Sequence, residues 1–183
     1  MARNIDATVQ TQLESPGRSE IVLCFLTVTD PDRDEPARIV CEENGNISFA
    51  NGLGTNYYLE GNLYYAIPYK FSRLSDDDRP ARAILTVPAF HRLILQWFRE
   101  MQNPARLKFE AYAESAWGDT IDDVDNSRSP ASTPNLIYSA DLMWLRNVDA
   151  GGTQIACEIG GYDFTQEPLG YRATKSLCPD LYR

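Results

Sequence analysis

The strongest constraint on the fold of this chain is a helical apolar pattern in residues 88–101. Large apolar side chains recur at the three- and four-residue spacing of one helix face, namely Phe90, Leu93, Ile94, Trp97, Phe98 and Met101. Pro88 suits the first helical position, because its missing N–H would have no partner there, and Asn103-Pro104 predicts the end. Aromatic rings on one stripe are typical of core, so we expect this helix to cover a sheet face.

Most of the remaining chain has the apolar or alternating patterns of β-strands. The segment 20–29 is β-branched and nearly continuous in apolar character, which is typical of a buried strand. Residues 60–62 and 149–152 are turn signals between two such segments and predict hairpins. The expected strands are 20–29, 38–42, 57–59, 63–69, 82–87, 106–113, 136–148 and 153–162. The sequence therefore predicts a mainly β (α+β) fold, an antiparallel β-sandwich or flattened barrel with one flanking amphipathic helix.

The domain organisation predicted from the 183 residues is one domain with two arms. We expect the β-rich domain at 20–162, an N-terminal arm at 1–19 and an extended C-terminal arm at 163–183. In the first arm a four-residue apolar spacing predicts a short helix, formed by Ile5, Val9 and Leu13. Residues 115–134 are rich in Asp, Ser and Pro without a period, and they predict a long mobile loop.

The net charge of −9 argues against nucleic-acid binding, because phosphate affinity needs clustered Lys and Arg. No apolar run approaches the roughly 18 residues that a membrane-spanning helix needs. The first residues have no apolar segment of a secretory signal. We therefore expect a protein that is made and kept in a cytosol-like compartment.

The four cysteines predict no metal site, since none of them forms a C-x-x-C pair. Cys24, Cys41 and Cys157 each lie inside an apolar strand pattern, where we expect buried, reduced thiols. Cys178 lies near the end and receives no assignment. No cofactor is expected.

Candidate catalytic residues are scarce. His91 is the only histidine, and its helical core neighbours favour a surface or boundary position over a catalytic one. Two acidic clusters could hold a hard cation, but a solvated surface explains both better, since neither has the spacing of a calcium loop. They are Asp76, Asp77 and Asp78, and Asp119, Asp122, Asp123 and Asp125. We expect no enzymatic activity.

Several segments, taken in order from Glu20, resemble a family of tailed-phage minor tail proteins. They are 21–28, 39–44, Gly61-Asn-Leu-Tyr-Tyr-Ala-Ile-Pro-Tyr69, Arg79-Pro-Ala-Arg-Ala-Ile-Leu-Thr-Val87, 158–168 and 171–182. The resemblance covers about nine-tenths of the chain and includes the N-terminal domain of minor tail protein L of lambda-like phages. That protein continues into a cysteine-rich region associated with an iron–sulfur cluster. Cys178 is the only cysteine in the corresponding part here, so we do not expect the cluster.

The resemblance implies a structural virion protein of the tail tip, with the β fold of tail tubes. Such a protein would be assembled in the host cytoplasm as a homo-oligomer, a threefold collar between the tail tube or distal tail ring and the central hub. DNA would pass the lumen without specific binding, and Asp76, Asp77 and Asp78 are candidates to face it. The candidate inter-subunit arms carry Ile5, Val9, Leu13, Tyr171, Leu177, Leu181 and Tyr182.

Two other functions are compatible with the residues. A carbohydrate-binding module would stack sugars on exposed aromatic rings, for which Tyr57, Tyr58 and Trp117 are the candidates. A cell-wall hydrolase would need two carboxylates across a cleft, and the 26 acidic residues leave that pair open.

Overall fold

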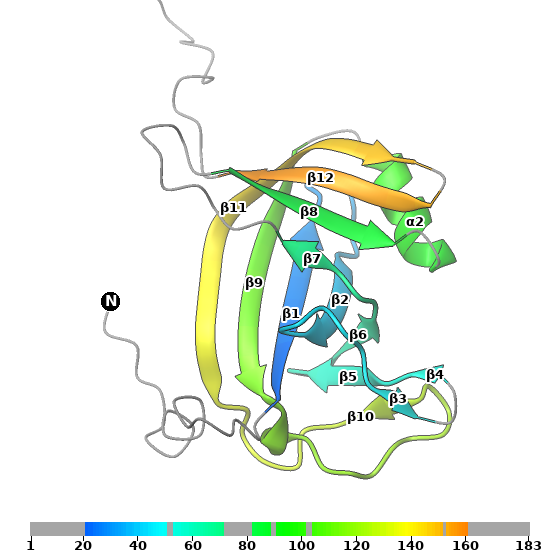
Figure 1. Ribbon diagram of the computed structural model, residues 1–183, viewed down its shortest axis with the longest axis vertical. Helices are drawn as coiled ribbons and strands as arrows, with labels where there is room; N and C mark the ends of the chain where they lie inside the picture. The colour runs from blue at the N-terminus through cyan, green and yellow to red at the C-terminus, as the bar shows by residue number, and fades with distance from the viewer. Residues whose placement is uncertain are drawn as a thin grey trace, which may run out of the picture.

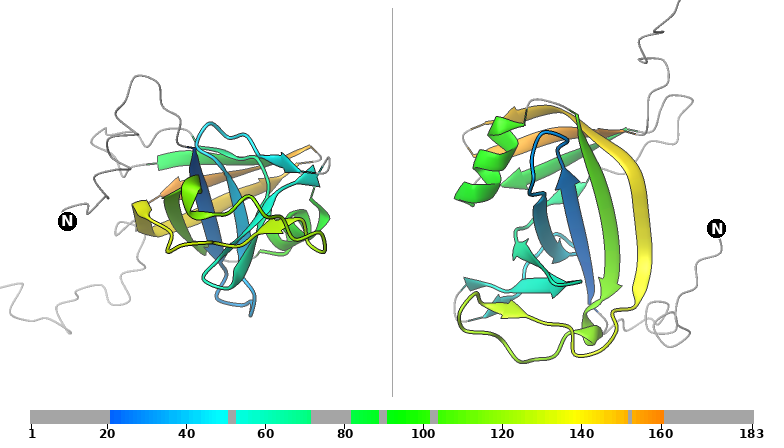
Figure 2. Two further views of the ribbon diagram at one scale, coloured as in Figure 1. Left: turned by 90° about the horizontal axis from the view of Figure 1, so that it is seen from below. Right: turned by 180° about the vertical axis from the view of Figure 1, so that it is seen from behind.

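The computed structural model describes residues 21–50, 53–71, 82–88, 91–101, 104–151 and 153–160 (Figure 1). This part of the chain is mainly β with one α-helix, as predicted, and its main sheet curls into a half-barrel (Figures 1 and 2). The elements are β1 (Val22–Thr29), β2 (Ala37–Glu42), β3 (Phe49–Ala50), β4 (Leu53–Gly54), β5 (Asn56–Leu59), β6 (Asn62–Ala66), β7 (Lys70–Phe71), β8 (Arg82–Pro88), α2 (Arg92–Glu100), β9 (Ala105–Ala113), the 3-10 turn η1 (Glu114–Ala116), β10 (Ser127–Arg128), β11 (Leu136–Ala150) and β12 (Gln154–Gly160).

The main sheet has ten strands in the order β10-β5-β6-β2-β1-β9-β11-β12-β8-β7, and β3 pairs with β4 separately. Most neighbours are antiparallel, as predicted, but β2 runs parallel to β6 and β5 runs parallel to β10. A parallel pair needs a connection that returns the chain to its starting end. Here β3, β4 and β5 lie between β2 and β6 in the chain, and local sequence patterns do not report such an excursion.

Strand β11 produces much of the curl. Its first part pairs with β9 and its last part with β12, and the pairing register shifts at three places along the strand. Such irregularities bend a strand and increase its local twist. Figure 1 shows the result, since β11 begins alongside β9 and ends across the top of the sheet beside β12.

Alternate residues of β1 enter two different cores. Cys24 and Leu26 belong to a first core, which also contains Leu85 of β8 and Ile155 of β12. Leu23 and Phe25 belong to a second core on the opposite face. Burial on both faces explains why the segment 20–29 shows no polar alternation.

The second core is an aromatic cluster. Phe25 is 1 % exposed and lies edge-on to three tyrosine rings, those of Tyr57, Tyr64 and Tyr112. The indole of Trp117 stacks on Phe25 with 5.4 Å between ring centroids. Edge-to-face and offset-stacked rings add to the stabilisation that burial gives. This cluster holds hairpin β5–β6 and the segment after β9 against the central strands.

The turn of hairpin β5–β6 has the predicted position. Glu60 and Gly61 have φ angles of 52° and 77°, and Leu59 pairs with Asn62. Positive φ at both central residues is the type I′ arrangement, whose twist matches that of the flanking strands. The turn between β11 and β12 also lies where it was predicted.

The predicted start and inner face of the helix need correction. The helix begins at Arg92, whereas Pro88 ends β8 opposite Gln154. Pairing with β12 continues to Pro88, so the strand is longer and the helix shorter than predicted. Strand β7 pairs only with Leu85 and Thr86, which leaves Pro88 on an edge where proline is tolerated. Leu93 is 58 % exposed, although the stripe predicted burial. Ile94, Trp97 and Phe98 are buried as predicted, Met101 is half-buried against the first core, and Phe90 lies outside the described residues.

The segment predicted as a long mobile loop, 115–134, forms a structured cover over the second core. It contains η1 and β10, and Trp117 pairs in a β-bridge with Pro130. Trp117 is 4 % exposed, and its Nε1–H donates to the carbonyl of Tyr58 over 2.9 Å. A segment that is held by individual side-chain contacts has no periodic apolar pattern, so the ordered structure of 115–134 was not predicted from the sequence.

Candidate functional site

A groove of about 590 Å³ lies between α2, the β1–β2 loop and hairpin β5–β6. Pockets that hold small ligands usually fall between about 300 and 1,000 Å³. Its main lining residues are Arg33, Arg38, Leu63, Tyr65, Leu93 and Trp97. They come from four separate elements, so the groove exists only in the folded chain.

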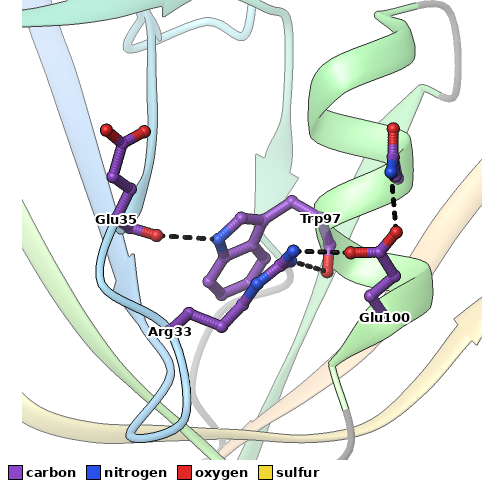
Figure 3. Close-up of polar contacts among 5 residues, drawn as sticks. Arg33, Glu35, Trp97 and Glu100 are labelled. Atoms are coloured by element: carbon purple, nitrogen blue, oxygen red, sulfur yellow. Dashed lines mark hydrogen bonds and ion pairs between the residues drawn. The ribbon is translucent and has the colours of Figure 1, made fainter.

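One wall of the groove is fixed by contacts between the β1–β2 loop and α2 (Figure 3). The guanidinium of Arg33 lies 5.5 Å from the Trp97 ring centroid and donates to the Trp97 carbonyl over 3.1 Å. Arg33 also forms an ion pair of 2.5 Å with Glu100. The Trp97 Nε1–H donates to the Glu35 carbonyl over 3.0 Å. Stacking combined with hydrogen bonding is what a planar guanidinium supplies, so the wall is preorganised.

The Glu100 carboxylate joins this network from the last turn of the helix. It accepts a hydrogen bond of 2.7 Å from Gln96, and this bond, followed by the charge of Arg33, lowers the pKa of Glu100. The carboxylate therefore stays ionised down to a more acidic pH than an isolated glutamate. The ion pair that holds the groove wall persists over the same range.

His91, immediately before α2, is a boundary residue, as predicted. Its imidazole lies 4.8 Å from the ring of Tyr65, and its Nδ1 is buried without a hydrogen-bond partner. Burial disfavours the charged imidazolium and lowers the pKa of His91. The contact with Tyr65 is between two tilted rings and does not bring a nucleophile to the imidazole.

We expect the pKa of His91 to lie below its ordinary value of 6.5. As the pH falls below 6.5, the unfolded chain binds a proton that the folded chain resists, so stability declines until the folded pKa is reached. His91 is the only histidine, so an NMR titration reports it without overlap. Replacing His91 with leucine should remove this part of the pH dependence. A folded-state pKa at or above 6.5 would contradict the burial of the imidazole.

The groove is more basic than the molecule as a whole. Arg33 and Arg38 line it, whereas Glu35 is the only acidic residue among its lining residues. Within the described ranges Arg38 forms no ion pair. Glu100 already pairs with Arg33, so Arg38 is the cation that the groove offers to a partner. In a chain of net charge −9, this arginine beside the apolar and aromatic lining residues favours an acidic partner that also carries an apolar side chain.

A surface with those properties exists on the same molecule, at the tip formed by residues 121–126. Val124 is 94 % exposed and stands between acidic residues, and Asp122 and Asp123 are also exposed. Asp122 pairs in a β-bridge with Ser127, and the Val124 N–H donates to Asp122 Oδ1 over 2.9 Å. The tip is therefore a tight turn that displays one apolar side chain.

The tip is attached to hairpin β5–β6 through its last acidic residue. The Tyr58 hydroxyl donates to Asp125 Oδ2 over 2.8 Å, and the Ser127 hydroxyl donates to Asp125 Oδ1. The bond from Ser127, supported by that from Tyr58, lowers the pKa of Asp125. Asn126, at a φ of 51°, donates to the Gly54 carbonyl over 2.8 Å. Tyr58 also lines the groove, so the base of the tip borders it, whereas Val124 is not among the lining residues.

A sugar-binding surface would require Tyr57, Tyr58 and Trp117 to be exposed, and this prediction is wrong for two of them. Tyr57 and Trp117 are 2 % and 4 % exposed, because both belong to the aromatic core. Tyr58 is half-buried, and its hydroxyl is engaged by Asp125. No flat aromatic platform for a sugar is therefore formed by these three residues.

Other predicted site residues lie outside the described part of the chain. They are Asp76, Asp77 and Asp78, the arm residues Ile5, Val9, Leu13, Tyr171, Leu177, Leu181 and Tyr182, and Cys178. The described thiols Cys24, Cys41 and Cys157 are buried and reduced, as predicted. Sequence patterns missed the groove and the tip, although an isolated valine among aspartates was a usable signal.

The described residues contain no cluster of three or more His, Cys, Asp or Glu that could hold a metal ion. None of the helices in the described ranges is long and apolar enough to cross a membrane. Comparison of the chain with protein-family models and with curated protein sequences found no match.

Proposed function

We propose that this protein is a structural virion protein of a phage tail tip, a subunit of a collar around the DNA channel. The sequence resemblance suggests its place between the tail tube or distal tail ring and the central hub. The observation that carries an assembly function is the match between the arginine-lined groove and the acidic, valine-bearing tip. Both surfaces are preorganised, so little conformational entropy would be lost when they meet.

The contact would join the tip of one copy to the groove of the next. Burying Val124 over Leu93 and Tyr65 would contribute about 1.5–3 kcal/mol if the side chain were fully covered. Charge pairs between Asp122 or Asp123 and Arg38 would each add about 0–1 kcal/mol at an exposed rim, and they would chiefly orient the partners. One such contact is weak, so a stable assembly requires several of them in a closed ring.

A contact between different surfaces on successive copies closes into a ring when its rotation allows. We propose threefold closure, following the resemblance to tail-tip collars. Such a ring would give the surrounding tail proteins a repeated surface. The net charge of −9 would let DNA pass the lumen without adhering to the wall.

The experiment that tests the function is cryo-electron microscopy of purified particles of a phage that encodes this chain, combined with mass spectrometry. We expect the chain among the particle proteins, with threefold density at the tail tip into which the half-barrel fits. If purified particles lack the chain, the proposed function is wrong. If the chain is present elsewhere in the particle, the tail-tip location is wrong.

A further inference from the structure

Two of the buried thiols face each other across neighbouring strands. Cys24 of β1 lies directly opposite Cys41 of β2 in the antiparallel register. Residues that oppose each other in this way project from the same face of a sheet. Both side chains therefore enter the first core together, where they are 6 % and 4 % exposed.

The hydrogen-bond phase of the ladder fixes the spacing of this pair. The Glu43 N–H donates to the Val22 carbonyl over 2.9 Å, and hydrogen-bonded pairs recur at every second residue. Cys24 and Cys41 are therefore a hydrogen-bonded pair, for which Cα atoms are typically about 5.5 Å apart. Disulfides span Cα separations of about 4.4–6.8 Å. The two sulfurs could join without a change of register.

A disulfide between Cys24 and Cys41 would be easily reduced, because cross-strand Cβ atoms lie farther apart than those of a relaxed disulfide. Opposed residues have Cβ atoms about 4.5–5.5 Å apart, whereas a relaxed disulfide prefers about 3.8 Å. Closure would draw the strands together and store strain. Strained disulfides are more easily reduced than structural ones.

Cys24 and Cys41 both line a cavity of about 400 Å³, together with Tyr69, Lys70, Phe109, Glu42 and Glu43. The Tyr69 hydroxyl donates to the Cys24 carbonyl over 2.9 Å. The Cys41 thiol donates to the Tyr69 carbonyl, with 3.9 Å between sulfur and oxygen. A small reagent that enters this cavity would therefore meet both cysteine residues.

We propose that Cys24 and Cys41 are a dithiol site that exchanges with a small-molecule disulfide and closes to a reversible cross-strand disulfide. The thiolate of one cysteine attacks a sulfur of the small disulfide and releases one thiolate. The second cysteine loses its proton and attacks the protein sulfur of this mixed disulfide, releasing the other thiolate. Overall, two protein thiols and one small disulfide give one protein disulfide and two small thiols.

The rate should depend on pH. Burial raises the pKa of Cys41 to about 11, against a small opposing effect of its hydrogen bond to Tyr69. The charged or titratable groups at the cavity are Tyr69, Lys70, Glu42 and Glu43. Because the thiolate is the attacking species, the rate should rise about tenfold per pH unit below this value if Cys41 attacks first.

The test uses the full chain with Cys157→Ala and Cys178→Ala, so that only Cys24 and Cys41 remain. After incubation with oxidised glutathione, free thiols are alkylated and the intact mass is measured. We expect loss of two hydrogens, no alkylation and no retained glutathione, with complete reversal by dithiothreitol. With Cys24→Ser in the same background, the remaining Cys41 can only stay free or retain one glutathione.

Two independent glutathione adducts on the folded chain would overturn the proposal. So would unreacted thiols after a time that fully oxidises the chain in denaturant. If the alanine background does not fold, peptide mapping of the oxidised wild-type chain decides. A Cys24–Cys41 crosslink supports the proposal, and a crosslink to Cys157 or Cys178 in its place contradicts it.

Discussion

Replacing Phe25 with alanine should lower the free energy of unfolding by about 3–5 kcal/mol. Phe25 is 1 % exposed and is the one ring that contacts all the other aromatic residues of the second core. Its removal would leave a cavity bordered by rings from three different segments, which cannot close around it together. Thermal unfolding should show a Tm lower by about 6–20 °C for a domain of this size.

The matched control is Phe49→Ala in β3. Phe49 is 69 % exposed, so the same chemical change should alter stability by no more than about 0.5 kcal/mol. Phe25→Leu should fall between the two, because it keeps apolar volume but loses the ring contacts. If Phe25→Ala and Phe49→Ala had equal effects, the aromatic cluster would not be the element that joins hairpin β5–β6 to the sheet.

The second large effect concerns association between copies. Arg38→Glu places a carboxylate at the rim where we propose that Asp122 and Asp123 of a neighbour lie. Like charges brought together at an interface are repulsive, and we expect the association constant to fall at least about tenfold, equivalent to about 1.4 kcal/mol. Sedimentation velocity over a concentration series measures this change.

The control for this substitution is Arg106→Glu, which makes the same change of charge. Arg106 is exposed on β9 and is not among the groove residues. Its reversal should leave association unchanged at physiological salt, where charges far apart are screened. Equal loss of association in both variants would mean that net charge, and not the groove, controls assembly.

Much of the fold could be predicted because its main strands have local signals. The near-continuous apolar run of 20–29 predicts β1, and alternation predicts β9. Turn residues such as Gly61 and Gly151 locate two hairpins. These patterns report which residues are buried, because burial follows directly from side-chain chemistry. They do not report which strand lies beside which, so the parallel β2–β6 pairing was not predicted.

The errors occurred where a distant segment decides the local structure. Pro88 has the properties of a helix start, but pairing with β12 keeps it in a strand. Trp117 lies in an aperiodic segment, and its burial depends on Phe25, which is distant in sequence. The groove could not be predicted at all, because its residues come from elements whose neighbours only the fold specifies.

We propose that this protein acts through contacts between the acidic tip of one copy and the basic groove of another. The most direct measurement is the molar mass, by sedimentation velocity, of a chain that carries Arg38→Glu, Asp122→Lys and Asp123→Lys together. A chain with only Arg38→Glu, or with only Asp122→Lys and Asp123→Lys, should be monomeric at concentrations where the wild-type chain associates. The combined chain restores opposite charges at the contact and should regain the wild-type molar mass. A combined chain that remains monomeric, or a wild-type chain that never associates, would show that the tip and the groove do not bind each other.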